Sequence, residues 1–203
     1  MGRSRGFRTP GFFIGLILLV VVVSAAIVGP VLVGADPYFM AYQDALLPPS
    51  SSHLFGTDEF GRDILVRSLL GLRLSLAIAV GAVFFGSIVG MIVGTVGAFN
   101  RGWLGEVIMR TSDIALAFPP IIIALAIVAF WGAGPVKLAI AIGLVQVPRF
   151  ARLVNSSVRV EMQQEYVTAA HALGSGLPRI ALVHLTRNVF APIIVELSLG
   201  VGT

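Results

Sequence analysis

Long stretches without charge constrain this chain more than any other feature of its sequence. Thr9 to Ala35 contains no charged residue and is centred on the apolar run Ile14 to Val23. About 20 apolar residues in a helix cross the hydrocarbon core of a bilayer, so this stretch is long enough to span it. Because 57% of all residues are hydrophobic and only 12% are charged, the chain lacks the polar surface of a soluble domain. We therefore expect lipid to cover most of its exterior.

Four more apolar stretches follow along the chain. They cover 74–100, 114–136, the segment from after Lys137 to about Val154, and 188–203. The pattern predicts an all-α, polytopic transmembrane helix bundle with five spans. The fifth stretch is shorter than a usual span and has no basic residue after it, so we expect a truncated chain.

The first stretch has a basic flank, as a signal peptide also has. Its apolar part is too long for a signal peptide and lacks a clear cleavage site, so we interpret it as a membrane anchor. We divide the chain into residues 1–73, which hold the N-terminal tail, the first span and an external loop with an interfacial helix, and residues 74–203, which hold the transmembrane core.

The distribution of Lys and Arg predicts the orientation, because cytoplasmic segments of membrane proteins are enriched in both. Of the 14 basic residues, ten fall on one side of the predicted spans and four on the other. This places the N-terminus and the segment 155–187 in the cytoplasm and the segment 36–73 outside. The four residues on the external side are Arg62, Arg67, Arg73 and Lys137.

Three glycines in the second stretch recur at every fourth position. Gly86, Gly90 and Gly94 would lie on one face of a helix, where the absence of side chains lets another backbone approach closely. The pattern predicts helix packing, either within this chain or between chains.

Two carboxylates fall within or beside the apolar stretches. Ionised groups in lipid are costly and normally face a partner or a watery path. Glu196 lies in the middle of the fifth stretch and is our candidate for lining a passage, whereas Asp113 would lie at the membrane interface beside Arg110.

Other polar and proline residues mark the third and fourth stretches. Arg149 and Arg152 are near the end of the fourth, and we expect their side chains to snorkel toward the interface. Pro119 and Pro120 would kink the third helix, because Pro120 removes a backbone donor and crowds the preceding turn. The kink would act as a gate or simply as a bend.

The external segment holds the run from His53 to Asp63, followed by an apolar stretch. Thr57 or Asp58 could cap a short helix resting on the outer interface, and Asp63 and Arg67 are spaced to pair. His53 has no second ligand at metal-binding spacing, and the chain contains no cysteine. We therefore expect no metal site.

A short amphipathic helix is predicted on the cytoplasmic side, within about 161–178. Tyr166, Val167, Ala170 and Leu173 recur at helical spacing, and Gly174 or Gly176 could stop the helix in a left-handed conformation. Pro178 would open the next element. Its small residues suit insertion into a groove on another protein.

Three motifs together resemble the C-type permease subunit of bacterial peptide ABC importers, the dipeptide, oligopeptide and nickel permease group. They are Phe55 to Asp63, Leu116 to Pro120, and Tyr166 to Gly174 with the later His184-Leu185. The family's coupling motif reads Glu-Ala-Ala, three residues, Gly. Thr168 stands here at the Glu position, and Arg187 stands where the family usually has proline.

The resemblance implies a type I importer permease that forms half of a translocation pathway for dipeptides or oligopeptides in the bacterial inner membrane. It implies a B-type permease partner, cytoplasmic ATPase subunits that bind the ATP, an extracytoplasmic binding protein, and no cofactor in this chain. It also implies an ATPase-coupling role for residues of the cytoplasmic helix: Glu165, Tyr166, Ala169, Ala170, Leu173 and Gly174.

Several other functions have little support in the sequence. The only lysine, Lys137, does not follow the glycines of a phosphate-binding loop, so we expect no ATPase or other enzyme activity in this chain. The net charge of +4 is spread between apolar runs, which argues against nucleic acid as a partner. A nickel or glutathione permease of the same family stays open. A self-contained carrier or channel also stays open, although Glu196 alone is thin support for it.

Overall fold

The computed structural model describes residues 10–34, 36–100, 102–174, 176 and 186–202. These segments are helices joined by turns, and their only extended pairing is an isolated bridge between Thr57 and Asp63. The predicted all-α class is confirmed. Predictions made for 177–185, including Pro178 and His184, lie outside the described residues.

The chain forms two compact units, residues 1–76 and 77–203. The first contains α1 (Pro10–Val33), the short 3₁₀ helix η2 (Tyr42–Asp44) and the beginning of α2 (Ile64–Phe99). In α1 the buried residue is Ala26, and apolar side chains are exposed around the whole helix. An apolar helix exposed on all sides suits a lipid environment, because in water this surface would be strongly unfavourable.

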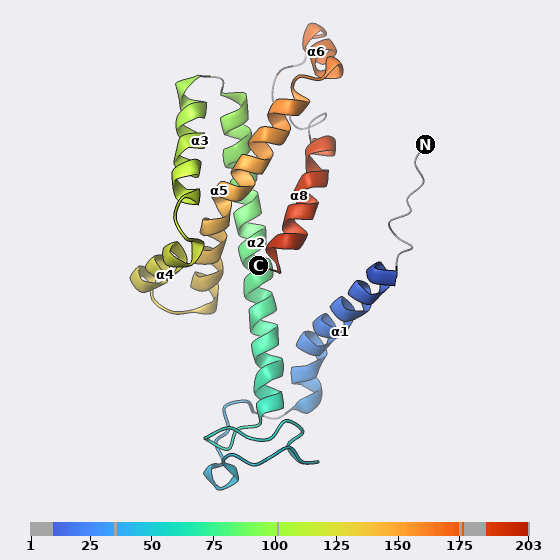
Figure 1. Ribbon diagram of the computed structural model, residues 1–203, viewed down its shortest axis with the longest axis vertical. Helices are drawn as coiled ribbons and strands as arrows, with labels where there is room; N and C mark the ends of the chain where they lie inside the picture. Colours follow the sequence, from blue (N-terminus) through green and yellow to red (C-terminus); the bar gives the residue numbers. More distant parts are fainter. Residues whose placement is uncertain (1–9, 35, 101, 175, 177–185, 203) are drawn as a thin grey trace. The chain divides into compact units, whose positions relative to one another are not determined.

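α2 is one helix of 36 residues (Figure 1). Residues 64–73 form its first turns, so the predicted short helix is not a separate element. Its predicted position at the outer interface stays a prediction. Once nucleated, a helix adds residues cheaply, and this segment contains no proline to end it. The expected cap at Thr57 or Asp58 is wrong. Asp63 lies directly before the helix, and its Oδ1 accepts a hydrogen bond from the Val66 N–H at 3.1 Å.

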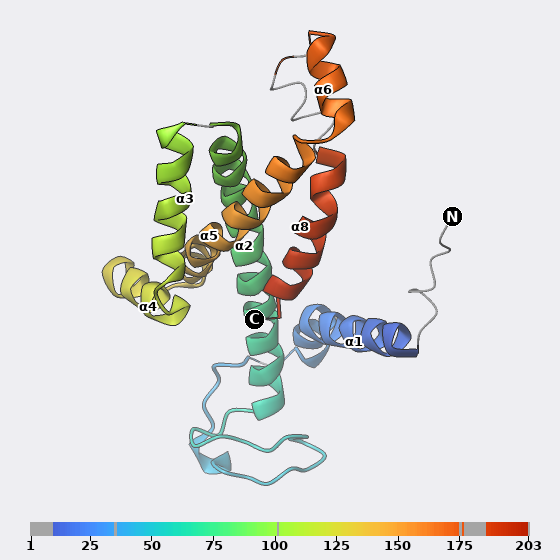
Figure 2. The ribbon, with the colours of Figure 1, turned by 45° about the horizontal axis from the view of Figure 1, so that its top comes forward.

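The third apolar stretch is divided between two helices. α3 (Trp103–Leu116) and α4 (Pro120–Trp131) meet at a bend of 94° (Figures 1 and 2). A continuous helix over 114–136 is thus wrong, because α3 begins at Trp103 and the chain breaks between Leu116 and Pro120. The prediction that this region forms one span stays a prediction. The predicted proline kink is confirmed in a stronger form. Pro119 adopts an extended conformation with ψ of 124°, and Pro120 opens the new helix at its first turn.

The second unit continues with α5 (Pro135–Glu161), α6 (Glu165–Ala172) and α8 (Thr186–Gly200). In the described part of the chain, α1, α2 and α5 are individually long and apolar enough to cross a membrane, and the bent pair α3 and α4 is a possible fourth span. The prediction of five spans therefore stays a prediction.

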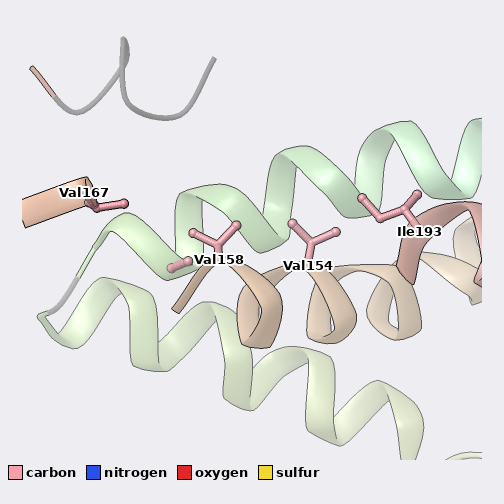
Figure 3. Packing of buried hydrophobic residues seen from close by; sticks show 5 residues of the cluster. Val154, Val158, Val167 and Ile193 are labelled. Carbon is pink, nitrogen blue, oxygen red and sulfur yellow. The ribbon is translucent and has the colours of Figure 1, made fainter. Parts of the chain in front are cut away.

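The core of the second unit lies where α5, α6 and α8 meet the end of α2. Val154 and Val158 of α5 pack with Val167 of α6 and Ile193 of α8, and Ala98 of α2 completes the cluster. Figure 3 shows the two α5 valines in a row between Val167 and Ile193. All five are buried, so one apolar cluster ties α6 to the helices that carry it.

Candidate functional site

The small helix α6 has one buried and one exposed face. Val167 is only 4% exposed and joins the core cluster, and Ala170 packs against the same cluster one turn later. Glu165, Ala169 and Leu173 are exposed, and Leu173 is 87% exposed. α6 is therefore held by Val167 and Ala170, and the exposed side chains of Glu165, Ala169 and Leu173 are available to a partner.

The first turn of α6 is fixed to the end of α5. The Tyr166 hydroxyl donates a hydrogen bond to Glu161 Oε1 at 2.6 Å. Between these residues the chain turns, and the Met162 N–H still bonds to the Val158 carbonyl at 2.9 Å. A movement of α6 would thus be transmitted to α5 through this short connection as well as through Val167.

The predicted bounds of the cytoplasmic helix are too wide. Residue 161 belongs to α5, and α6 itself ends at Ala172. Gly174 has φ of +82°, the left-handed conformation expected for a glycine that ends a helix. The sequence pattern also grouped Leu173 with Val167 and Ala170, but only the latter two face the core.

The glycines of α2 lie against α5 of the same chain. A Cβ atom at Gly90 would come within 2.9 Å of the Val147 carbonyl oxygen. At Gly94 it would lie 2.9 Å from the Cβ of Val154, and at Gly86 it would lie 2.6 Å from the Gly143 carbonyl oxygen. The two helix backbones therefore approach as closely as glycine allows. Sequence periodicity could not identify which helix is the neighbour.

Glu196 of α8 forms an ion pair with Arg149 of α5. The carboxylate side chain is 16% exposed and the arginine 48%, so the pair joins the two helices at a partly buried position. Sequence spacing did not predict this pair. The expectation that Arg149 snorkels to the interface stays a prediction. A role for Glu196 in lining a passage stays a prediction.

A second ion pair joins α5 to α3. Arg152 Nη1 lies 3.0 Å from Asp113 Oδ1, whereas Arg110 pairs with Glu106 at 3.7 Å. Asp113 therefore pairs with Arg152 of another helix and not with Arg110, which lies three residues before it. Snorkelling of Arg152 stays a prediction. The sequence contained a signal for these pairs. Arg149, Arg152, Asp113 and Glu196 lie in or beside different apolar stretches, and opposite charges within a membrane usually pair with one another.

The external motif organises its own loop. Asp58 accepts hydrogen bonds from Arg62 Nε at 2.8 Å and Arg67 Nη1 at 2.7 Å. The predicted pair between Asp63 and Arg67 is thus wrong, and His53 Nδ1 lies 2.9 Å from Asp63 Oδ2 instead. Burial raises the pKa of Asp63, but the His53 contact and the Val66 and Leu65 N–H groups outweigh it and leave the pKa below its ordinary value.

We predict that Asp63→Ala weakens the external end of α2 by about 1 kcal/mol, because it removes both the helix cap and the partner of His53. The lowered pKa of Asp63 means that its ionised form contributes stability that is full above the ordinary pKa near 4 and is lost as pH falls through the folded value. Hydrogen exchange of residues 53–70, followed below pH 4, measures both effects.

Glu59, an exposed carboxylate in the same loop, provides the matched control. Glu59→Gln should leave the exchange and its pH dependence unchanged. Asp63→Asn should retain most of the cap but lose the acid dependence. An acid dependence unaffected by Asp63→Asn would contradict the assignment.

In the described residues no three His, Asp or Glu side chains gather in a way that could hold a metal ion. The expectation that this chain binds no cofactor stays a prediction.

Similarity to known proteins shows the family to which this chain belongs. Residues 82–203 match the family described as the binding-protein-dependent transport system inner membrane component. The chain belongs to this family, and it is a multi-pass membrane protein. The bent pair, α5, α6 and α8 all fall within the matched region.

Individual relatives agree with this assignment. The chain is 41% identical over 194 residues to the dipeptide transport system permease protein DppC of Alkalihalophilus pseudofirmus, with 94% of the chain aligned. It is 37% identical over 192 residues, 92% of the chain, to the di/tripeptide permease protein DppC of Pseudomonas aeruginosa. It is 36% identical over 201 residues, 99% of the chain, to the glutathione transport system permease protein GsiD of Escherichia coli.

The chain spans 62%, 63% and 65% of the length of these three relatives, respectively. The resemblance to permease components of peptide importers, predicted from three motifs, is confirmed.

Proposed function

We propose that this chain acts as a transmembrane permease subunit of an ATP-driven ABC importer for dipeptides and oligopeptides. Its relatives with the highest identity given above are named as dipeptide and di/tripeptide permeases. In this proposal the chain forms half of the translocation pathway and couples to cytoplasmic ATPase subunits. It does not hydrolyse ATP and needs no cofactor of its own.

The two faces of α6 carry the coupling part of the proposal. A helix that transmits force needs a surface for the driving partner and a rigid attachment to the parts that move. Ala169 and Leu173 supply the first, and Val167 supplies the second through its contacts with Val154, Val158 and Ile193. Displacement of α6 would therefore move α5 and α8 together, which suits alternation between inward and outward openings.

The remaining partners follow from the family. We propose a B-type permease subunit as the other half of the pathway, an extracytoplasmic binding protein that delivers the peptide, and the lipid of the bacterial inner membrane. Nucleic acid is not among the proposed partners. The N-terminus and α6 would face the cytoplasm, in keeping with the excess of basic residues on that side.

Glutathione is the second candidate cargo. The similarity to the glutathione permease covers 99% of this chain at 36% identity, close to the value for the di/tripeptide relative. Glutathione is itself a modified tripeptide, so the same pathway could accept either. Competition between a labelled dipeptide and glutathione for uptake distinguishes the two, because only the true cargo competes at low concentration. Nickel chelates are the further alternative within the family.

Copurification and reconstitution test the main proposal. The tagged chain, expressed with the gene products encoded beside it, should retain an ATPase and a second permease subunit through detergent extraction. Vesicles that contain the whole assembly, with its ATPase subunits facing the lumen, should accumulate peptide only when ATP is in the lumen and the binding protein is outside. Ion-driven uptake by the purified chain alone would instead identify a self-contained carrier and overturn the importer.

A further inference from the structure

A groove of about 700 Å³ lies between α3 and the last turns of α5. The ion pairs between helices and the proposed coupling role of α6 leave the function of this groove unexplained. The charged and aromatic side chains that line it come from both helices: Trp103, Glu106, Arg110, Asp113, Arg152 and Arg159.

The spacing of these residues places them on two facing stripes. Glu106, Arg110 and Asp113 follow one another by four and three residues on α3, and Arg152, Ser156 and Arg159 do so on α5. Residues at this spacing share one helix face. The Arg152 to Asp113 contact at 3.0 Å joins the stripes at one end of the groove. Arg159 and Trp103 lie toward the other end, near the C-terminus of α5 and the N-terminus of α3.

The groove has more cationic than anionic groups, with three arginines facing two carboxylates. Arg110 and Glu106 are 3.7 Å apart and both largely exposed, so their attraction is weak. Within the described ranges no carboxylate lies at ion-pair distance from Arg159. Its Nη2 makes one long bond, 3.5 Å, to the Gly97 carbonyl oxygen. Guanidinium donors therefore remain available, and a phosphate oxygen is the acceptor that matches their geometry.

The surroundings favour a phosphate carried by a lipid. Trp103 is 77% exposed at the mouth of the groove, and Leu104 and Val107 are exposed on the neighbouring surface of α3. Tryptophan concentrates at the level of lipid headgroups, and exposed aliphatic side chains beside it suit acyl chains. Basic pockets between helices at the cytoplasmic interface suit anionic headgroups. A free phosphate would make no use of these apolar residues.

We propose that this groove binds the phosphodiester of an anionic phospholipid, with Arg159 and Arg110 as the main contacts and Trp103 at the headgroup level. Bound lipid would bridge α3 and α5 beside the Arg152 to Asp113 pair. The proposal concerns a site for membrane lipid and holds for any transported cargo.

Fluorescence of Trp103 provides the test. The chain has two tryptophans, so Trp131→Phe leaves Trp103 as the only reporter. The full chain is placed in vesicles of equal parts phosphatidylglycerol and phosphatidylcholine, with bromine on the acyl chains of one lipid or the other. Brominated phosphatidylglycerol should quench Trp103 more strongly than brominated phosphatidylcholine. Arg159→Gln should reduce this preference about fivefold, the effect of one basic residue near an anionic surface.

Arg73→Gln is the matched control, because Arg73 is an exposed arginine outside the groove. It should leave the preference unchanged. Equal quenching by the two lipids would overturn the proposal. Loss of the stronger quenching by brominated phosphatidylglycerol on addition of inorganic phosphate would also overturn it, because this result would indicate a site for free anions. Unchanged lipid preference in Arg159→Gln, accompanied by loss of a copurifying cytoplasmic protein, would identify the groove as a protein contact instead and also overturn it.

Discussion

Replacing Gly90 with leucine is expected to prevent α2 from packing against α5 and to abolish recovery of a monodisperse protein. A Cβ at this position already approaches the Val147 carbonyl oxygen to 2.9 Å and the Ala151 nitrogen to 3.1 Å. Both atoms belong to the α5 backbone and cannot rotate away, unlike the end of a flexible side chain. The helices must therefore separate.

Separation of α2 and α5 has a cost that extends beyond this one contact. It would disturb the contacts of Gly86 and Gly94 on either side, and with them the Asn155 amide that donates to the Gly94 carbonyl at 3.3 Å. We expect the free energy of unfolding to fall by about 3 kcal/mol, which is the upper end of the usual cost of inserting extra side-chain atoms into a well-packed interior. Size-exclusion chromatography and thermal unfolding of the detergent-extracted protein measure it.

Gly71→Leu controls for the change of residue in the same helix. A Cβ at Gly71 has no atom within 4 Å, so this variant should be recovered at nearly the normal yield. Normal yield and stability of Gly90→Leu would refute the close contact of α2 with α5.

Gly174→Val is expected to uncouple the permease from its ATPase while the membrane helices stay folded. Gly174 has φ of +82°, which a β-branched residue adopts only with strain of about 2 kcal/mol. Relief of that strain would extend or redirect the chain after Ala172 and displace Leu173. This strain would shift the equilibrium between the left-handed conformation at residue 174 and other backbone conformations about thirtyfold away from the left-handed one. Stimulation of the copurified ATPase by peptide-loaded binding protein is the measurement.

Gly174→Asn is the matched control, because asparagine tolerates the left-handed conformation better than other residues with a side chain. A Cβ at Gly174 meets no atom within 4 Å, so crowding does not distinguish the two variants. A strong loss of ATPase stimulation in Gly174→Val and a mild loss in Gly174→Asn would support a requirement for the left-handed conformation at this position. Equal stimulation in the valine variant and the unchanged protein would argue against a role for this turn in coupling.

Comparison of particular elements shows which features the sequence could predict. The apolar runs predicted membrane helices, and the pair Pro119-Pro120 predicted the break between α3 and α4, because proline acts on its own turn. Glycine predicted the end of α6 for the same local reason, and of the two candidates, Gly174 and Gly176, Gly174 has the positive φ. The starts of α2 and α3 lie earlier in the chain than the apolar stretches predict, at Ile64 and Trp103. Helical propensity is weak enough at such ends that neighbouring contacts decide them.

Pairing between distant residues was the part that sequence spacing predicted poorly. Asp63 and Arg67 are four residues apart, yet Asp63 contacts His53, and Arg67 contacts Asp58. Likewise Asp113 has Arg110 three residues away but pairs with Arg152. Local spacing limits which charges can meet on one helix, whereas the folded chain offers partners from every element packed nearby.

The sequence by itself determined that this chain is a set of apolar helices interrupted at prolines and glycines, because these features depend on hydrophobicity and on backbone freedom within a few residues. Only the tertiary structure decided that α5 lies against the α2 glycines, that Arg149 and Arg152 are each neutralised by a different helix, and that Val167 rather than Leu173 holds α6. Close contact between distant segments depends on how whole helices fit together, which no residue's immediate neighbours specify.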